Sequence, residues 1–168
     1  MRFDRSITRL FAMDDRVWAR HASPWSVWTR IATLPLLIMA FWSRVWLGEW
    51  ALLPIALALI WTWLNPRLFA PPDTTDHWTS RAVLGERVWL NRSRIPIPAH
   101  HARAALILSA VAAIGGLITV WGVIVLDVYL TVLGAVLVYG GKLWFLDRMV
   151  WLYQDMQTAC DEYRRWLY

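Results

Sequence analysis

The most constraining feature of this 168-residue sequence is the apolar stretch Ala104–Leu146. Its only charged residues are Asp127 and Lys142. As a single helix, its 43 residues would measure about 64 Å at 1.5 Å per residue. That length is twice the hydrocarbon thickness of a bilayer, which is about 30 Å. The stretch therefore predicts two membrane crossings folded back to back, with the turn within residues 122–127.

A second pair of apolar segments precedes it, at residues 31–47 and 50–64. As helices they would measure about 26 and 23 Å, which is short for a bilayer. Pro35 and Pro54 kink helices but are tolerated in membrane segments, and Gly48 marks a turn. The pair either crosses a thin membrane or re-enters from one side. The predicted fold class is all-α: an integral membrane protein with four membrane helices in two hairpins, accompanied by interfacial amphipathic helices.

Polar segments flank the two hairpins. Residues 1–20 carry apolar side chains at helical spacing, which is typical of an amphipathic helix in the membrane interface, and residues 21–30 connect this helix to the first hairpin. In the long connection, Pro66 is expected to end the preceding helix, and Asp76 is the expected N-cap of a short interfacial helix. The chain thus divides into five parts: an amphipathic N-terminal segment (1–30), a first hairpin (31–64), a cytoplasmic loop with the short helix (65–103), a second hairpin (104–146) and a helical tail (147–168).

The composition agrees with a bilayer environment. Mean hydropathy is +0.40, and charged residues make up 17% of the chain, against about 25% in soluble domains. The single cysteine excludes an intramolecular disulfide and a multi-cysteine metal site. Tryptophan, present fourteen times, is enriched where membrane meets water. The tryptophans expected to anchor the protein at the interface are Trp18, Trp25, Trp28, Trp46, Trp50, Trp78 and Trp89.

Arginine is distributed unevenly along the chain. Six arginines lie in residues 1–30 and six in residues 65–103, whereas the predicted turns within the two hairpins contain only Arg44. Because basic residues collect in cytoplasmic loops, both termini and residues 65–103 are predicted to face the cytoplasm, with the protein in the bacterial inner membrane. The net charge of +5 then suits anionic lipid headgroups as partners, and no nucleic-acid partner is expected.

All four histidines fall on this predicted cytoplasmic face, together with several carboxylates. Imidazole and carboxylate ligands suit Zn²⁺ or non-haem iron. His100 and His101 open the third membrane helix, and adjacent helical residues point about 100° apart. Only one of this pair is therefore expected to face the bundle, and the polar loop would have to bring in a second histidine. The candidate metal ligands are His77, Glu86, His100, His101 and Asp147.

Simpler interpretations compete with these sites. The sequence has no HExxH motif, and the competing interpretation places the histidines among lipid headgroups while the acids pair with arginines. Lys142 lies inside an apolar run, which makes it a functional candidate. It is only about one turn from the cytoplasmic end, where a lysine extends its ammonium group to the headgroups. We favour that second interpretation of Lys142.

Four blocks of the sequence resemble a known family. They are HASPWSVWTR, WTWLNPRLF, VLGERVWLNR and GKLWFLDRMVWLYQDM. They are similar to small bacterial and archaeal membrane proteins catalogued as a domain of unknown function, DUF6653, over about residues 20–157. The resemblance implies a membrane location. It implies no activity, so no catalytic residue is carried over from it.

Three functions follow from these observations as alternatives. Small residues share faces of the third helix at Ser109 and Ala113 and at Ala112 and Gly116, which permits close approach of another helix. Without a recognisable catalytic motif, this favours an accessory or interaction subunit of a membrane assembly, with a second copy or another membrane protein as partner. A membrane enzyme with a cytoplasm-facing His/carboxylate metal site is the alternative. A small transporter is third, because no polar site is expected at the midplane.

Overall fold

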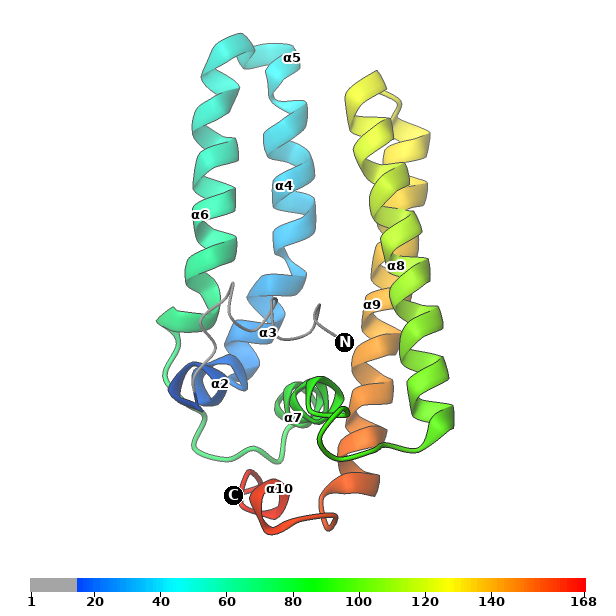
Figure 1. Cartoon of the computed structure of the whole chain (residues 1–168). Helices are drawn as coiled ribbons and strands as arrows, with labels where there is room; N and C mark the ends of the chain where they lie inside the picture. The colour runs from blue at the N-terminus through cyan, green and yellow to red at the C-terminus, as the bar shows by residue number, and fades with distance from the viewer. Residues whose placement is uncertain (1–14) are drawn as a thin grey trace.

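The computed structural model describes residues 15–168, and every secondary-structure element in that range is a helix (Figure 1). The all-α prediction is confirmed for this part of the chain. The first described helix is α2, Asp15–His21. The amphipathic helix predicted for the N-terminal segment falls largely on residues 1–14, which lie outside the described residues.

Two helical hairpins stand side by side (Figure 1). The first rises through α3 (Pro24–Ile31) and α4 (Thr33–Trp42), turns through α5 (Arg44–Leu47) and the 3-10 helix η1 (Gly48–Ala51), and descends as α6 (Leu52–Leu68). The second consists of α8 (Ala99–Val125) and α9 (Val128–Met156). Its turn lies at Leu126, which has a φ of 58°, within the predicted range 122–127.

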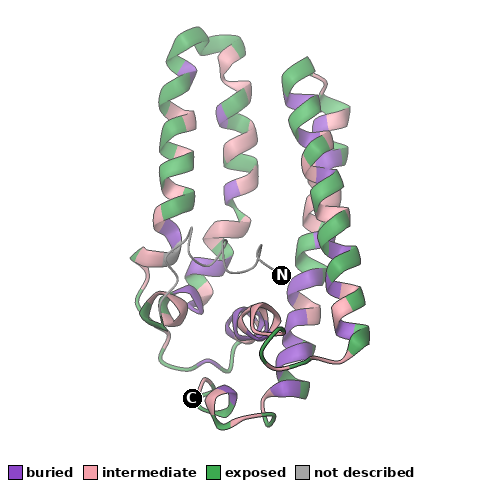
Figure 2. Cartoon of the chain, in the orientation of Figure 1, coloured by how far each residue is buried: buried purple, intermediate pink, exposed green. Residues whose placement is uncertain are grey.

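Three helical stretches are long and apolar enough to cross a membrane: Pro24–Asn65, Ala99–Val125 and Val128–Met156. The first of them folds back on itself at the tip of the first hairpin (Figure 1). Most of the upper surface of both hairpins is exposed in the chain alone (green in Figure 2), and much of it is leucine, isoleucine, valine and tryptophan. Apolar exposure on this scale marks a membrane or partner surface. Four separate crossings stay a prediction.

Glycines bring α8 and α9 into backbone contact. A Cβ atom on Gly115 would lie 2.7 Å from the Cβ of Leu137, and one on Gly134 would lie 2.4 Å from the backbone nitrogen of Thr119. Helices approach this closely only where one of them lacks a side chain. Gly116, on the face predicted from the sequence, is not used in this way, because a Cβ there would meet nothing within 4 Å in the described chain.

Helix α7, Trp78–Leu90, is a packed core helix. It lies beneath the hairpins (Figure 1), and its Val83 and Val88 are fully buried near Met149 of α9. The sequence predicted an interfacial helix that rests on the membrane, and the position of α7 relative to a membrane stays a prediction. Its four consecutive residues Ala82 to Gly85 are small or apolar on every side of the helix, which suits a helix enclosed by protein.

The end of α6 differs from the sequence prediction. This helix continues through Pro66 and ends at Leu68. The last turns of α6 are bonded to α3 through Asn65. Its buried amide accepts a hydrogen bond from Ser26 Oγ at 3.0 Å and donates one to Thr29 Oγ1 at 2.7 Å. These bonds tie the last turns of α6 to α3 beside Pro66, which cannot donate a backbone hydrogen bond.

The start of α7 also differs from the prediction. His77, not Asp76, is its N-cap residue, and its side chain makes no capping bond. The Asp76 carboxylate pairs with Arg81 instead. An ion pair competes here with the capping role that a short acidic side chain usually takes.

Three short helices gather at the end of the hairpins away from the tips. They are α2, α7 and α10 (Asp161–Arg164) (Figure 1). The connection between the hairpins and the C-terminal residue therefore lie at the same end as α2. We call this end the polar end of the molecule.

Candidate functional site

Four polar side chains from four helices meet where the hairpins join the polar end. They form the ionic junction, which consists of His21 on α2, Arg30 on α3, Glu86 on α7 and Lys142 on α9. The Lys142 ammonium lies 2.6 Å from a Glu86 carboxylate oxygen. This contact joins α7 to α9. Lys142 thus has a partner within the protein, while an extension of its half-exposed side chain toward headgroups stays a prediction.

Burial and charge set the protonation of the junction. Burial acts to raise the pKa of Glu86, but Lys142 and Arg30 together outweigh it and hold that pKa below its usual value. The side chain is only 16% exposed. Burial first, and then the Arg30 cation, lower the pKa of His21 to about 3. A neutral His21 ring can accept the hydrogen bond that Arg30 Nη1 donates to its Nδ1 at 2.9 Å.

A small cavity of about 160 Å³ opens beside the junction. Its polar lining includes Arg30, Glu86 and Lys142, and the rest is mainly apolar side chains of α3, α4 and α9. Tyr139 also lines it and donates a hydrogen bond to the Ile31 carbonyl at 2.7 Å. The cavity lies between the two hairpins, so the junction connects parts of the chain that are far apart in sequence.

A second polar group, the histidine–aspartate cluster, consists of His100 and His101 on α8 and Asp155 on α9. One possible ligand atom from each residue lies within 4.8 Å of the other two. His101 Nε2 is 2.8 Å from Asp155 Oδ2. The His101 side chain is 2% exposed, whereas His100 and Asp155 are exposed. Two imidazoles and a carboxylate are a donor set that transition metals accept.

The five ligands predicted from the sequence are distributed over separate places. Glu86 belongs to the ionic junction. Asp147 accepts a hydrogen bond from Trp78 Nε1 at 3.3 Å, and His77 is exposed at the start of α7. Only His100 and His101 stay together, and the carboxylate beside them is Asp155. No sequence signal singled out Asp155 over the other acids at this end, because the pairing of α8 with α9 selects it.

The adjacent histidines also differ from the geometric expectation. Their backbone directions do diverge, since His101 is buried and His100 is exposed. Their rings nevertheless converge, with centroids 4.1 Å apart and planes tilted by 39°. An imidazole is long enough to lean toward its neighbour in the first turn of a helix. The loop and His77 are therefore not needed to bring two imidazoles together.

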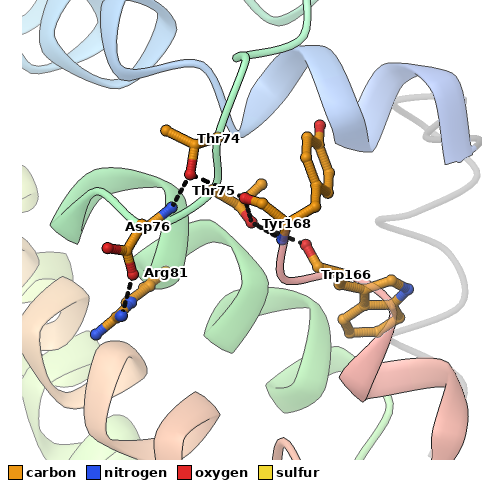
Figure 3. A network of polar contacts seen from close by, with 6 residues as sticks. All are labelled: Thr74, Thr75, Asp76, Arg81, Trp166 and Tyr168. Atoms are coloured by element: carbon orange, nitrogen blue, oxygen red, sulfur yellow. Dashed lines mark hydrogen bonds and ion pairs between the residues drawn. The ribbon is translucent and has the colours of Figure 1, made fainter.

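A latch at the polar end ties the C-terminal segment to the connection between the hairpins (Figure 3). The Thr75 N–H donates to the Tyr168 carbonyl at 2.8 Å, and the Thr75 hydroxyl donates to the Trp166 carbonyl at 3.0 Å. The Tyr168 N–H donates back to that hydroxyl at 2.9 Å. Trp166 also packs its ring against the Arg87 guanidinium, 4.0 Å from the ring centroid. The sequence carried no signal for this latch.

The predicted interface tryptophans fall into two groups. The side chains of Trp25, Trp28, Trp46 and Trp50 are exposed in the chain alone. Those of Trp18, Trp78 and Trp89 are partly buried and pack against the core of the polar end. Anchoring at the membrane stays a prediction for all seven, and it fits the exposed group best.

The model of a family of unknown function, DUF6653, matches residues 2–165 of the chain. The chain belongs to this family. The match extends beyond both ends of the resemblance at residues 20–157 that the four sequence blocks indicated. No curated protein and no solved structure matches the chain. Membership in DUF6653 brings no activity with it, so the chemistry of the chain must be argued from its own geometry.

Proposed function

We propose that the chain is a four-crossing membrane protein whose polar end faces the cytoplasm and which serves as an interaction subunit of a membrane assembly. The first step is the number of crossings. Arg44, at the tip of the first hairpin, donates hydrogen bonds to the carbonyls of Val123 and Ile124 at the end of α8, the latter at 3.0 Å. The two tips are therefore level. If α8 and α9 cross a bilayer, this contact favours crossing over re-entry for the first hairpin.

The orientation rests on charge. The polar end includes the arginine-rich connection between the hairpins. At the tips lies Arg44, whose guanidinium donates hydrogen bonds to carbonyls at the end of α8. A cytoplasmic polar end agrees with the tendency of basic residues to stay inside, and with anionic headgroups as neighbours.

Cysteine labelling tests the crossings and the orientation together. In a Cys160→Ser background, a cysteine at Glu49 should react with a membrane-impermeant maleimide added from outside, whereas one at Ser93 should react only after permeabilisation. Both positions are exposed in the chain. Labelling of Ser93 but not Glu49 from outside would reverse the orientation. Protection of both would contradict a first hairpin that crosses.

The interaction role rests on the outer face of α8 and α9. A groove of about 660 Å³ runs along this face and includes Gly140, Trp144 and Arg148. A Cβ on Gly140 would meet nothing within 4 Å in the described chain. Glycines that the chain itself does not use permit another helix to approach closely. A second copy or another membrane protein is the proposed occupant.

Size measurement in mild detergent tests this role. The protein extracted from native membranes should run as a complex larger than one chain after correction for bound detergent. Gly140→Leu should reduce it to a single folded chain, because leucine favours the helix but blocks close approach. Val120→Leu, at an exposed position of α8 that does not line the groove, is the control. A monodisperse single chain from native membranes would remove the interaction proposal.

A further inference from the structure

We propose that His100, His101 and Asp155 form a Zn²⁺ site at the polar end of α8 and α9. The inference does not rest on the number of crossings or on a partner subunit. It needs only the pairing of α8 with α9, which the described part of the chain contains. The site differs from the set expected from the sequence, since it uses Asp155 and omits His77, Glu86 and Asp147.

The register of the second hairpin brings these residues together. Gly122 near the turn faces Thr131, and Gly141 farther along α9 faces Leu108 and Ala112 of α8. The same antiparallel alignment, continued to the polar end, places the first turn of α8 beside the last turn of α9. His101 and Asp155 are in contact for this reason.

The spacing of the donor atoms fits a metal ion after a small adjustment. With Zn–N and Zn–O bonds of about 2.0–2.2 Å, two ligands of a tetrahedral ion lie roughly 3.3 Å apart. The ligand atoms of the cluster already lie within 4.8 Å of one another, and one pair is 2.8 Å apart. His100 and Asp155 are exposed side chains that can adjust by rotation, whereas the buried His101 is held in place.

The two ring nitrogens of His101 have different surroundings. Its side chain is 98% buried, and its Nδ1 has no hydrogen-bond partner among the described residues. Buried polar atoms without a partner are uncommon in folded proteins. Nε2 is the nitrogen beside Asp155, and a metal takes the unprotonated nitrogen of a neutral imidazole. Since Nδ1 has no partner among the described residues, it is free to carry the proton while Nε2 coordinates.

The number of donors indicates the kind of site. Structural zinc sites are closed by four protein ligands, whereas three protein ligands leave a position for water. Two histidines and one carboxylate give an open site. Because His100 and Asp155 are exposed, that open position would face the water and headgroups at the polar end. The competing account is a His101–Asp155 hydrogen bond with His100 merely beside it.

Metal titration distinguishes the two accounts. The full-length protein, purified in detergent with an affinity tag that contains no histidine, is titrated with Co²⁺, a coloured substitute for Zn²⁺. We expect about one equivalent to bind, with the visible absorption of four-coordinate cobalt, and Zn²⁺ to displace it. Zn²⁺ should also raise the unfolding temperature, because it binds only the folded chain.

Three variants test the ligand assignment. His100→Ala and Asp155→Asn alter exposed residues and should each weaken Co²⁺ binding by at least about tenfold. His77→Ala, which alters an exposed histidine of the same polar end, should leave it unchanged. His101→Ala is included with circular dichroism as a check on folding, but the assignment does not depend on it. Binding of less than about a tenth of an equivalent, wild-type affinity in both exposed variants, or a loss in His77→Ala would each overturn the proposal.

Discussion

A Cβ atom placed on Gly85 would lie 1.9 Å from the carbonyl oxygen of Met149. At that position α7 rests directly on the backbone of α9, and the polar end is assembled around this contact. Sequence periodicity does not mark Gly85, since a glycine within a helix is usually an unfavourable residue.

Gly85→Ala should destabilise the protein despite the better helix propensity of alanine. The added methyl group meets backbone atoms, which cannot rotate away, so α7 must move from α9. We expect a loss of about 3 kcal/mol or more, at the upper end of overpacking effects, measured by thermal unfolding in detergent. Gly116→Ala is the control, because nothing in the described chain lies within 4 Å of its added Cβ. Equal stability of the two variants would refute the close contact.

The ionic junction should make the protein sensitive to mild acid. His21 is neutral in the fold because its pKa is lowered from 6.5 to about 3. The unfolded chain therefore binds a proton that the folded chain does not, and stability should fall as pH decreases from 6.5 toward 3. His21→Gln should flatten the slope of unfolding temperature between pH 7 and pH 5.

Glu86 does not account for acid sensitivity in that window. Its folded pKa is lowered from 4.5, so the stability it contributes is fully present above pH 4.5 and is lost only at lower pH. Glu86→Gln should therefore leave the slope between pH 7 and pH 5 unchanged. A wild-type slope in His21→Gln would show that another group is protonated on acidification.

Arg44 should hold the tips of the two hairpins together. With Arg44→Met, the carbonyls of Val123 and Ile124 lose a charged donor, whose hydrogen bonds are stronger than neutral ones. Spin labels at Glu49 and Val128, in a Cys160→Ser background, should then report a broader and longer distance distribution. Arg44→Lys should restore part of the order, because lysine keeps the charge but not the planar set of donors. An unchanged distribution in Arg44→Met would show that the tips are held by other contacts.

The latch should protect the C-terminal segment from proteolysis. Thr75→Val removes the hydroxyl that bonds Trp166 and Tyr168 while keeping the side-chain shape, at a cost of about 1–2 kcal/mol. Trypsin should then cleave faster after Arg164 and Arg165. Thr62→Val, at an exposed position of α6 where the hydroxyl bonds the Ala58 carbonyl of the same helix, is the control. Equal cleavage rates in the two variants would contradict the latch.

Much of the architecture follows from local sequence. The run Ala104–Leu146 is too long and too apolar for one crossing, and its hairpin appears as α8 and α9 with the turn at Leu126. The first hairpin and its tip at Gly48 follow in the same way. Hydrophobic length and turn chemistry are properties of neighbouring residues, so they can be recognised before any tertiary contact is known.

The candidate sites depend on contacts between distant segments. Sequence analysis placed His100 and His101 correctly at the start of a helix, but only the pairing of α8 with α9 selects Asp155 as their neighbour. It placed Lys142 near the end of an apolar run, but only the burial of α7 brings Glu86 to it.

The role of each small residue was also undetermined by sequence. Gly115 and Gly116 are adjacent and chemically identical, yet one packs against α9 and the other is open. The sequence by itself determined the two hairpins and where each of them turns, because those properties depend on residues close in the chain. The tertiary structure decided which helix faces meet, because adjacent positions on a helix point about 100° apart and the packing partner alone selects between them.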